Sequence, residues 1–264
     1  MEDLNFLKEE LFCTGLESRI FAAYVNYGKL ERWMPGFSDP TTEDSHLKRY
    51  HFAAQFTANK KVLDMASGCG KGSHMLATEG KALSVDGIDL DHEAIRYAKH
   101  RFVAPHLNFF QADATSYIKP NFYDVIVSFE TVEHLPQIES YLKNINDSLS
   151  TYGIFLISTP LSAMELDSQP KNPYHVREWG FQRFQQEVQK FLHIREVHVQ
   201  LYPILQSGLA QRVVNKLKVV AGVPVPNVPK LSQIWPYQSN SNNYVESEFG
   251  KRQKGYQLLF CTKK

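Results

Sequence analysis

The sequence predicts a doubly wound α/β fold of seven strands, with helices ahead of the core and an insert before the last strand. Short apolar runs of strand character alternate with helical patterns between residues 61 and 202, and the connections are short. The first run, Val62 to Met65, leads into a turn with glycine at positions 68, 70 and 72, where a ligand can approach the backbone closely. In such sheets ligands bind at the carboxyl ends of the strands.

Before the core, residues 4–12 and 16–27 carry apolar side chains at helical spacing and predict two helices. Residues 34–45 are polar and rich in turn-forming residues. They predict a loop, a candidate lid, that leads into a third helix over residues 46–57.

The core elements follow in order, and the run 123–129 is apolar enough to be a fully buried strand. Strands are predicted over residues 61–65, 85–89, 107–111, 123–129, 154–158, 193–202 and 255–262. Helices are predicted over residues 72–79, from the N-cap Asp91 to Val103, and over residues 136–149 and 182–192.

Three units are expected from this pattern. Residues 1–45 form an N-terminal helical cap and lid, and residues 46–202 with 253–264 form the core. Residues 203–252 form an insert, rich in Pro, Ser and Asn, that we interpret as shaping the substrate site. A purely structural or disordered insert is the open alternative.

Composition excludes several classes of protein. A chain of 264 residues with 43% hydrophobic residues is long enough for one core and an extra lobe. The net charge is +1, with 29 basic and 28 acidic residues, so no extended nucleic-acid or membrane surface is expected. Three scattered cysteines do not make a disulfide framework or a zinc site. Because no leader and no membrane-spanning run is evident, we expect a cytoplasmic protein.

The turn after the first strand fits one class of cofactor. A dinucleotide fingerprint needs glycine where Ser73 stands, and a phosphate loop needs Ser or Thr after Lys71. Asp64 at the strand end disfavours a pyrophosphate but suits an ammonium group. Residues 64–70 resemble the motif D-x-G-x-G-x-G of class I S-adenosylmethionine-dependent methyltransferases, with Ala66 in place of the first glycine. The resemblance implies a Rossmann-like methyltransferase fold, whose last strand is antiparallel beside the fifth, and S-adenosylmethionine as cofactor.

Asp89 ends the second strand about 20 residues after the turn, where an acid accepts both ribose hydroxyls. The resemblance implies that Leu90 lies against the adenine and that Asp113 accepts from its amino group. Taken singly, Asp89 and Asp113 could equally cap a helix or a turn. Arg49 and Tyr50 are candidates either for closing over the methionine part of the cofactor or for plain packing. The predicted cofactor-binding residues are Asp64, Ala66, Gly68, Gly70, Asp89, Leu90, Asp113, Ala114 and Phe129.

The end of the fourth strand carries candidate catalytic groups. Glu130, Glu133 and His134 share one face if the chain turns helically there. This E-x-x-E-H pattern resembles the metal site of small-RNA 2′-O-methyltransferases and occurs in similar form in ubiquinone-pathway O-methyltransferases. In the small-RNA enzymes a further histidine follows the fifth strand in a segment like H-x-x-E-W, which His175 begins here. The resemblance implies Glu130, Glu133, His134 and His175 as ligands, and oxygen and imidazole donors suit Mg²⁺ or Mn²⁺.

These features predict a metal-assisted O-methyltransferase that acts on a hydroxyl of a sugar, glycan or small secondary metabolite, with His134 and Glu133 as catalytic residues. Three alternatives stay open. They are an RNA 2′-O-methyltransferase, which the near-neutral charge disfavours, a metal-independent enzyme with His134 as general base, and a non-catalytic S-adenosylmethionine-binding scaffold. A small-molecule or sugar acceptor is the expected partner, nucleic acid is not expected, and a homodimer is left open.

Overall fold

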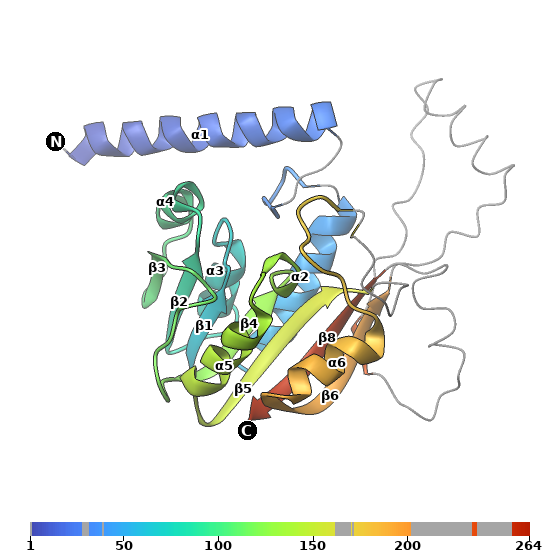
Figure 1. Ribbon diagram of the computed structural model, residues 1–264. Coiled ribbons are helices and arrows are strands. Elements are labelled where there is room, and N and C mark those ends of the chain that lie inside the picture. Colours follow the sequence, from blue (N-terminus) through green and yellow to red (C-terminus); the bar gives the residue numbers. More distant parts are fainter. Residues whose placement is uncertain are drawn as a thin grey trace, which may run out of the picture.

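The computed structural model describes residues 2–27, 32–38, 40–161, 170, 172–201, 234–236 and 255–264. In these ranges one mixed sheet has the strand order β3-β2-β1-β4-β5-β8-β6-β7 (Figure 1). Neighbouring strands from β3 to β5 are parallel, and β8 is antiparallel to both β5 and β6. The strands are β1 Lys61–Met65, β2 Ser84–Asp89, β3 Leu107–Gln111, β4 Tyr123–Phe129, β5 Leu149–Pro160, β6 Leu192–Leu201, β7 Ile234–Pro236 and β8 Gly255–Lys263.

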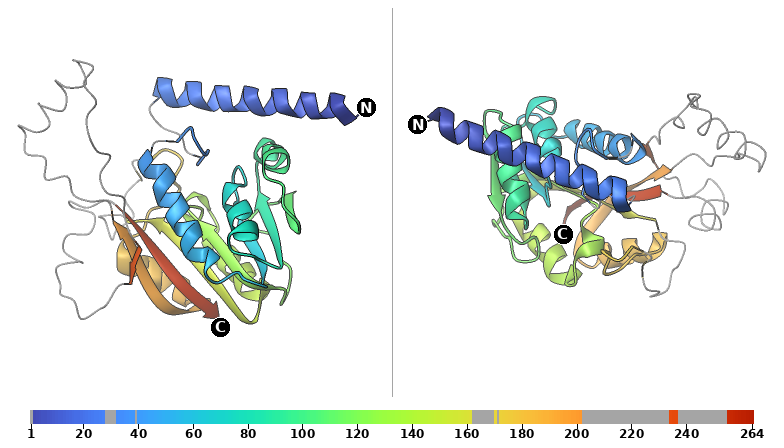
Figure 2. Two further views of the ribbon diagram at one scale, coloured as in Figure 1. Left: turned by 180° about the vertical axis from the view of Figure 1, so that it is seen from behind. Right: turned by 90° about the horizontal axis from the view of Figure 1, so that it is seen from above.

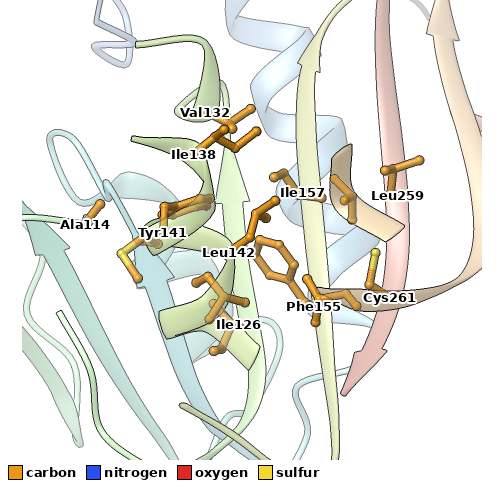
Figure 3. Close-up of a cluster of buried hydrophobic side chains, with 14 of the residues drawn as sticks. Ala114, Ile126, Val132, Ile138, Tyr141, Leu142, Phe155, Ile157, Leu259 and Cys261 are labelled. Carbon is orange, nitrogen blue, oxygen red and sulfur yellow. The ribbon is translucent and has the colours of Figure 1, made fainter. Parts of the chain in front are cut away.

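Helices cover both faces of the sheet because the strands are apolar on both sides (Figure 1). On one face α2 and α3 pack through Tyr50, Ala53 and Leu76. On the other face Tyr141 and Leu142 of α5 pack in the cluster that Figure 3 shows. The helices are α1 Glu2–Tyr27, α2 Pro40–Ala54, α3 Lys71–Thr78, α4 His92–Arg101, the 3-10 turn η1 Val132–His134, α5 Ile138–Ser148 and α6 Phe181–Gln189.

The predicted fold class is confirmed. All seven predicted strands are present, β1, β3 and β4 begin and end at the predicted residues, and the last strand lies antiparallel beside β5. Asp91 caps α4 as expected, because its side chain accepts from the amide of Glu93 at 2.8 Å. The described sheet also has an additional three-residue strand, β7, which pairs with β6.

The prediction of two N-terminal helices is wrong, because α1 runs without a break from Glu2 to Tyr27. Gly15 would ordinarily cost a helix about 1 kcal/mol relative to alanine. Cys13 and Leu16, on either side of Gly15, are both buried against the body of the protein, so packing holds the helix through it. The helix lies across α4 (Figure 2), where Glu9 pairs with Arg96 at 2.8 Å.

The predicted loop 34–45 is too long, because α2 already begins at Pro40. Proline suits the first turn of a helix, where its missing N–H needs no partner. The helix ends at Ala54, whose carbonyl accepts from the hydroxyl of Thr57 at 3.1 Å.

Most of the predicted insert 203–252 lies outside the described residues, apart from β7. The division into cap, core and insert therefore stays a prediction. Among the helices of the described ranges, none combines the length and apolarity needed to cross a bilayer.

Candidate active site

A cavity of about 400 Å³ opens at the carboxyl ends of β1, β2 and β4. This volume is in the range of small-molecule sites. Seven of the nine predicted cofactor-binding residues line it: Ala66, Gly68, Asp89, Leu90, Asp113, Ala114 and Phe129. Asp64 and Gly70 are not among the lining residues.

Gly70 adopts a left-handed conformation with φ 89°. A Cβ atom there would lie 2.6 Å from the Cβ of Ala98 and 2.8 Å from the ring of Phe109. The glycine is therefore required by the close packing of the turn on α4 and β3. A cofactor contact at Gly70 stays a prediction.

Asp64 is fully buried and joins three elements. Its carboxylate accepts from the hydroxyl of Ser73 at 2.6 Å and from that of Tyr50 at 3.1 Å. Burial raises the pKa of Asp64 to about 7, against these two hydrogen bonds, which lower it. Asp64 thus anchors Tyr50, whose ring lines the cavity and packs edge-on against Phe129.

Ala66 and Gly68 form the turn itself, with φ values of 61° and 56°. An L-residue in this region costs about 1–2 kcal/mol, so Ala66 carries strain that the usual glycine would not. The amide of Gly68 donates to Asp89 Oδ2 at 2.9 Å, and the amide of Asp91 donates to Oδ1 at 2.9 Å. The acid that ends β2 is thus held in place by backbone amides.

Asp113 lines the cavity, and its Oδ1 also accepts from the amide and the hydroxyl of Thr115 at 2.8 and 2.7 Å. The side chain therefore shapes a turn, as the alternative interpretation expected, beside any contact with an adenine. Its role toward the cofactor stays a prediction.

Two cavity residues outside the predicted cofactor-binding set come from the segment that follows α1. Arg32 lies 3.5 Å from Asp89 and 2.9 Å from Asp91, and Trp33 stacks on His46 and on Tyr50. Both follow α1 in an unpatterned segment, so no motif or periodicity marks them. They line the cavity from the N-terminal side.

Three of the four predicted metal ligands come together at the end of β4. Ligand atoms of Glu133, His134 and His175 all lie within 4.8 Å of one another. The carbonyl of Glu133 accepts from the amides of Val176 and Arg177 at 2.8 and 3.2 Å, which brings His175 across from the distant segment.

Glu130 lies outside that group. Its φ is 54°, so the chain leaves β4 in a left-handed turn before η1, and the shared helical face that we expected does not form. Its Oε1 accepts from the hydroxyl of Ser158 at 2.6 Å, and the residue lines the cavity. Whether Glu130 binds a metal stays a prediction.

The group formed by Glu133, His134 and His175 fits a divalent cation. Glu133 is 1% exposed, and its Oε1 is buried without a hydrogen-bond partner, whereas Oε2 accepts from Thr159 at 3.1 Å. Burial, with the neighbouring charge of Glu130, raises the pKa of Glu133 well above its ordinary value. A cation beside Oε1 would remove this penalty.

The imidazoles are oriented as metal ligands usually are. Nδ1 of His134 lies 3.0 Å from the carbonyl of Tyr174, and Nδ1 of His175 lies 2.7 Å from a carboxylate oxygen of Glu178. Both partners only accept, so each Nδ1 carries the hydrogen and Nε2 carries the lone pair. Nε2 of His175 lies 2.9 Å from the side-chain amide of Asn172, from which it accepts, so metal binding at this nitrogen would have to replace that hydrogen bond.

Comparisons with known proteins agree with this fold. The family described as a methyltransferase domain matches residues 43–202. A fatty-acid O-methyltransferase of Mycolicibacterium smegmatis is 27% identical over 164 residues, 59% of this chain and 56% of that protein. A ubiquinone biosynthesis O-methyltransferase of Glaesserella parasuis is 31% identical over 108 residues, 38% of this chain and 45% of that protein. The chain thus spans about half the length of these curated relatives.

Among solved structures, Haemonchus contortus phosphoethanolamine N-methyltransferase 2 in complex with S-adenosyl-L-methionine superimposes with a TM-score of 0.58. The sequence identity is 15%, and the match covers 94% of this chain and 57% of that one. At this identity the likeness shows the fold alone.

Proposed function

Because the chain belongs to the methyltransferase domain family, we propose that it is an S-adenosylmethionine-dependent O-methyltransferase. It acts with a divalent metal ion on a hydroxyl group of a sugar, glycan or small secondary metabolite. The observation that carries the proposal is the group Glu133, His134 and His175, because His134 belongs both to that group and to the cavity wall. Two of the named relatives are O-methyltransferases, which supports oxygen as the acceptor atom.

The cofactor supplies an electrophilic methyl group on a sulfonium. The cavity residues bind and orient it: Asp89 offers a carboxylate held by two amides, and Tyr50 and Phe129 offer aromatic surface near the end of β4. Orientation matters because methyl transfer is an in-line displacement, whose rate depends on the alignment of donor and acceptor.

On the acceptor side, Nε2 of His134 can serve in one of two ways: it binds the ion in the metal-assisted enzyme, or, without an ion, it takes the hydroxyl proton. Glu133 and His175 would hold the ion together with His134. When bound, a divalent ion lowers the pKa of a hydroxyl in its coordination sphere. The carbonyl of Tyr174 and the carboxylate of Glu178 keep the two rings oriented.

The test uses Glu133→Ala, with Glu139→Ala on the exposed start of α5 as a matched control. Mn²⁺ binding is followed by electron paramagnetic resonance, and S-adenosylhomocysteine binding by calorimetry. We expect Glu133→Ala to lose Mn²⁺ affinity by about a hundredfold, with unchanged S-adenosylhomocysteine affinity, and Glu139→Ala to alter neither. Chelator should abolish methyl transfer to a panel of polyols and sugars, and Mn²⁺ should restore it.

A metal-independent enzyme is the second candidate, because His134 lines the cavity in the tautomer that a general base needs. Full turnover in chelator, abolished by His134→Ala, would establish it and refute the metal. If neither preparation converts the cofactor with any acceptor while still binding it, the scaffold alternative gains and the enzymatic proposal fails.

A further inference from the structure

Arg49 on α2 is a fully buried arginine. Its Nη1 donates to the side chain of Gln200 on β6 at 2.7 Å, and its Cζ lies 4.2 Å over the ring of Tyr256 on β8. The next residue, Tyr50, points instead to Asp64 on β1. Two consecutive residues of α2 thus contact different parts of the sheet, Arg49 the strands β6 and β8 and Tyr50 the strand β1.

The other edge of the Arg49 guanidinium has no partner among the residues that the structure describes. Nε and Nη2 are both buried and make no hydrogen bond. Of the nearby carboxylates, Glu130 accepts from Ser158 and Glu133 accepts from Thr159 through Oε2, whereas Oε1 of Glu133 is likewise buried without a partner among the described residues. Burying charged donors without partners is costly, so an anionic acceptor at this edge would be stabilising.

Arg49 is not itself among the residues that line the cavity, but residues beside it on α2 are. His46 and Tyr50, one turn before and one residue after Arg49, both line the cavity, as does Glu130. The positive charge of Arg49 acts on groups at two places in the cavity lining. Burial and then this charge hold the pKa of His46 well below its ordinary value, and the same charge opposes the burial that raises the pKa of Glu130.

Two adjacent N–H groups of a guanidinium, Nε and Nη2, match the two oxygens of a carboxylate. We propose that the acceptor carries a carboxylate besides its reacting hydroxyl, as a uronic acid or an aromatic hydroxy acid does, and that Arg49 binds this carboxylate through Nε and Nη2. The inference rests on the proposed function. The methionine carboxylate of the cofactor has the same chemistry, but the partners of Arg49 lie on β6 and β8, away from the cofactor turn.

The first arm of the test compares ligands that differ in one group. D-Glucuronate is paired with D-glucose, and 3,4-dihydroxybenzoate with 3,4-dihydroxybenzyl alcohol. Binding is measured by calorimetry in the presence of S-adenosylhomocysteine and Mn²⁺. At least one acid should bind the wild-type protein about tenfold or more tightly than its neutral partner. Equal binding within both pairs, or no binding of either acid, overturns the proposal.

The second arm changes the arginine. Arg49→Gln should abolish the preference for the acid, and Arg49→Lys should keep only part of it, because lysine offers a point charge and no planar pair of donors. Arg183→Gln on α6, where Arg183 is 59% exposed, is the matched control and should keep the full preference. If Arg49→Gln does not fold, Arg49→Lys decides, and an undiminished preference in it refutes the assignment.

The third arm separates the two possible carboxylates. If Arg49 held the cofactor, Arg49→Gln or Arg49→Lys would weaken S-adenosylhomocysteine but not 5′-methylthioadenosine, which lacks the amino-acid part, and the assignment to the acceptor would be wrong. Methyl transfer without any acid preference would leave the proposed function standing and remove this inference. Acid binding through Arg49 without methyl transfer would leave the assignment of Arg49 standing and remove the proposed function.

Discussion

On the β1–β3 side of the cavity the two buried carboxylates already have hydrogen-bond donors, although Oγ of Ser67 in the turn has none among the described residues. Asp89 takes two backbone amides, and Asp64 takes the hydroxyls of Ser73 and Tyr50. On the β5–β8 side, Arg49 and Glu133 are buried with polar atoms that have no hydrogen-bond partner in the described part of the chain. Their contacts join segments far apart in the chain, such as Arg49 with Gln200.

This difference in hydrogen bonding suggests that the two sides of the cavity have different roles in ligand binding. A site whose hydrogen bonds are complete before the ligand arrives is preorganised and loses little on binding. In a site with buried unpaired charges, the unpaired groups are unfavourable until a ligand of opposite charge pairs with them. Such a site therefore selects for that ligand. We infer that the β1–β3 side sets where the cofactor lies and that the β5–β8 side sets what it methylates.

The strongest challenge to this comparison is a substitution at Gly70. Gly70→Ala combines left-handed strain with a Cβ too close to Ala98 and Phe109, and should cost about 4 kcal/mol of unfolding free energy. Gly68→Ala shares the strain, but its nearest contact is 3.8 Å away, so about 1 kcal/mol is expected. Urea unfolding of both variants measures the two costs. Equal losses would mean that the β1–β3 side is not as tightly packed as we infer.

A smaller effect is expected from the pH dependence of Asp64. Its pKa is raised to about 7, against about 4 in an unfolded chain, so the folded state binds more protons between these values. Its contribution to stability is complete below about pH 4 and is lost as the pH rises through 7, and about 3 kcal/mol of this loss falls between pH 5 and pH 8. Asp64→Asn should flatten this part of the stability curve, measured by urea unfolding from pH 5 to pH 8. An unchanged slope would show that Asp64 is ionised in the folded protein.

The smallest effect is expected from one substitution on each side of the cavity, with the affinity for both ligands measured in each variant. Asp89→Asn removes a charged acceptor from two amides and should weaken S-adenosylhomocysteine by about tenfold, without changing Mn²⁺ affinity. His175→Ala should do the opposite. Calorimetry and electron paramagnetic resonance on both variants give the four affinities. Loss of both ligands in either variant would show that the two sides act as one unit.

Much of this molecule was predictable from short stretches of sequence. The strands β1, β3 and β4, the cap at Asp91 and the cavity position of Asp89 all follow from patterns within a few residues. Such patterns work because hydrogen bonding and side-chain alternation in a strand or a turn depend mainly on near neighbours.

Other features depended on contacts between distant segments. The continuity of α1 through Gly15 depends on packing against the body, and Arg32 reaches Asp89 from an unpatterned segment. The left-handed conformation of Glu130 moves its side chain out of the expected metal group. No periodicity in the sequence predicts these three features, because the contacts that stabilise them are made with residues that only folding brings near.

The sequence by itself determined a doubly wound sheet, a cofactor turn after the first strand and the residue types at the end of the fourth strand. The tertiary structure decided which of those residues meet. Glu133 gains His175 through two backbone hydrogen bonds, and Arg49 is left with an unpaired edge beside the cavity. The physical reason is that a motif specifies local backbone and chemistry, whereas burial and pairing of charge depend on every segment packed around them.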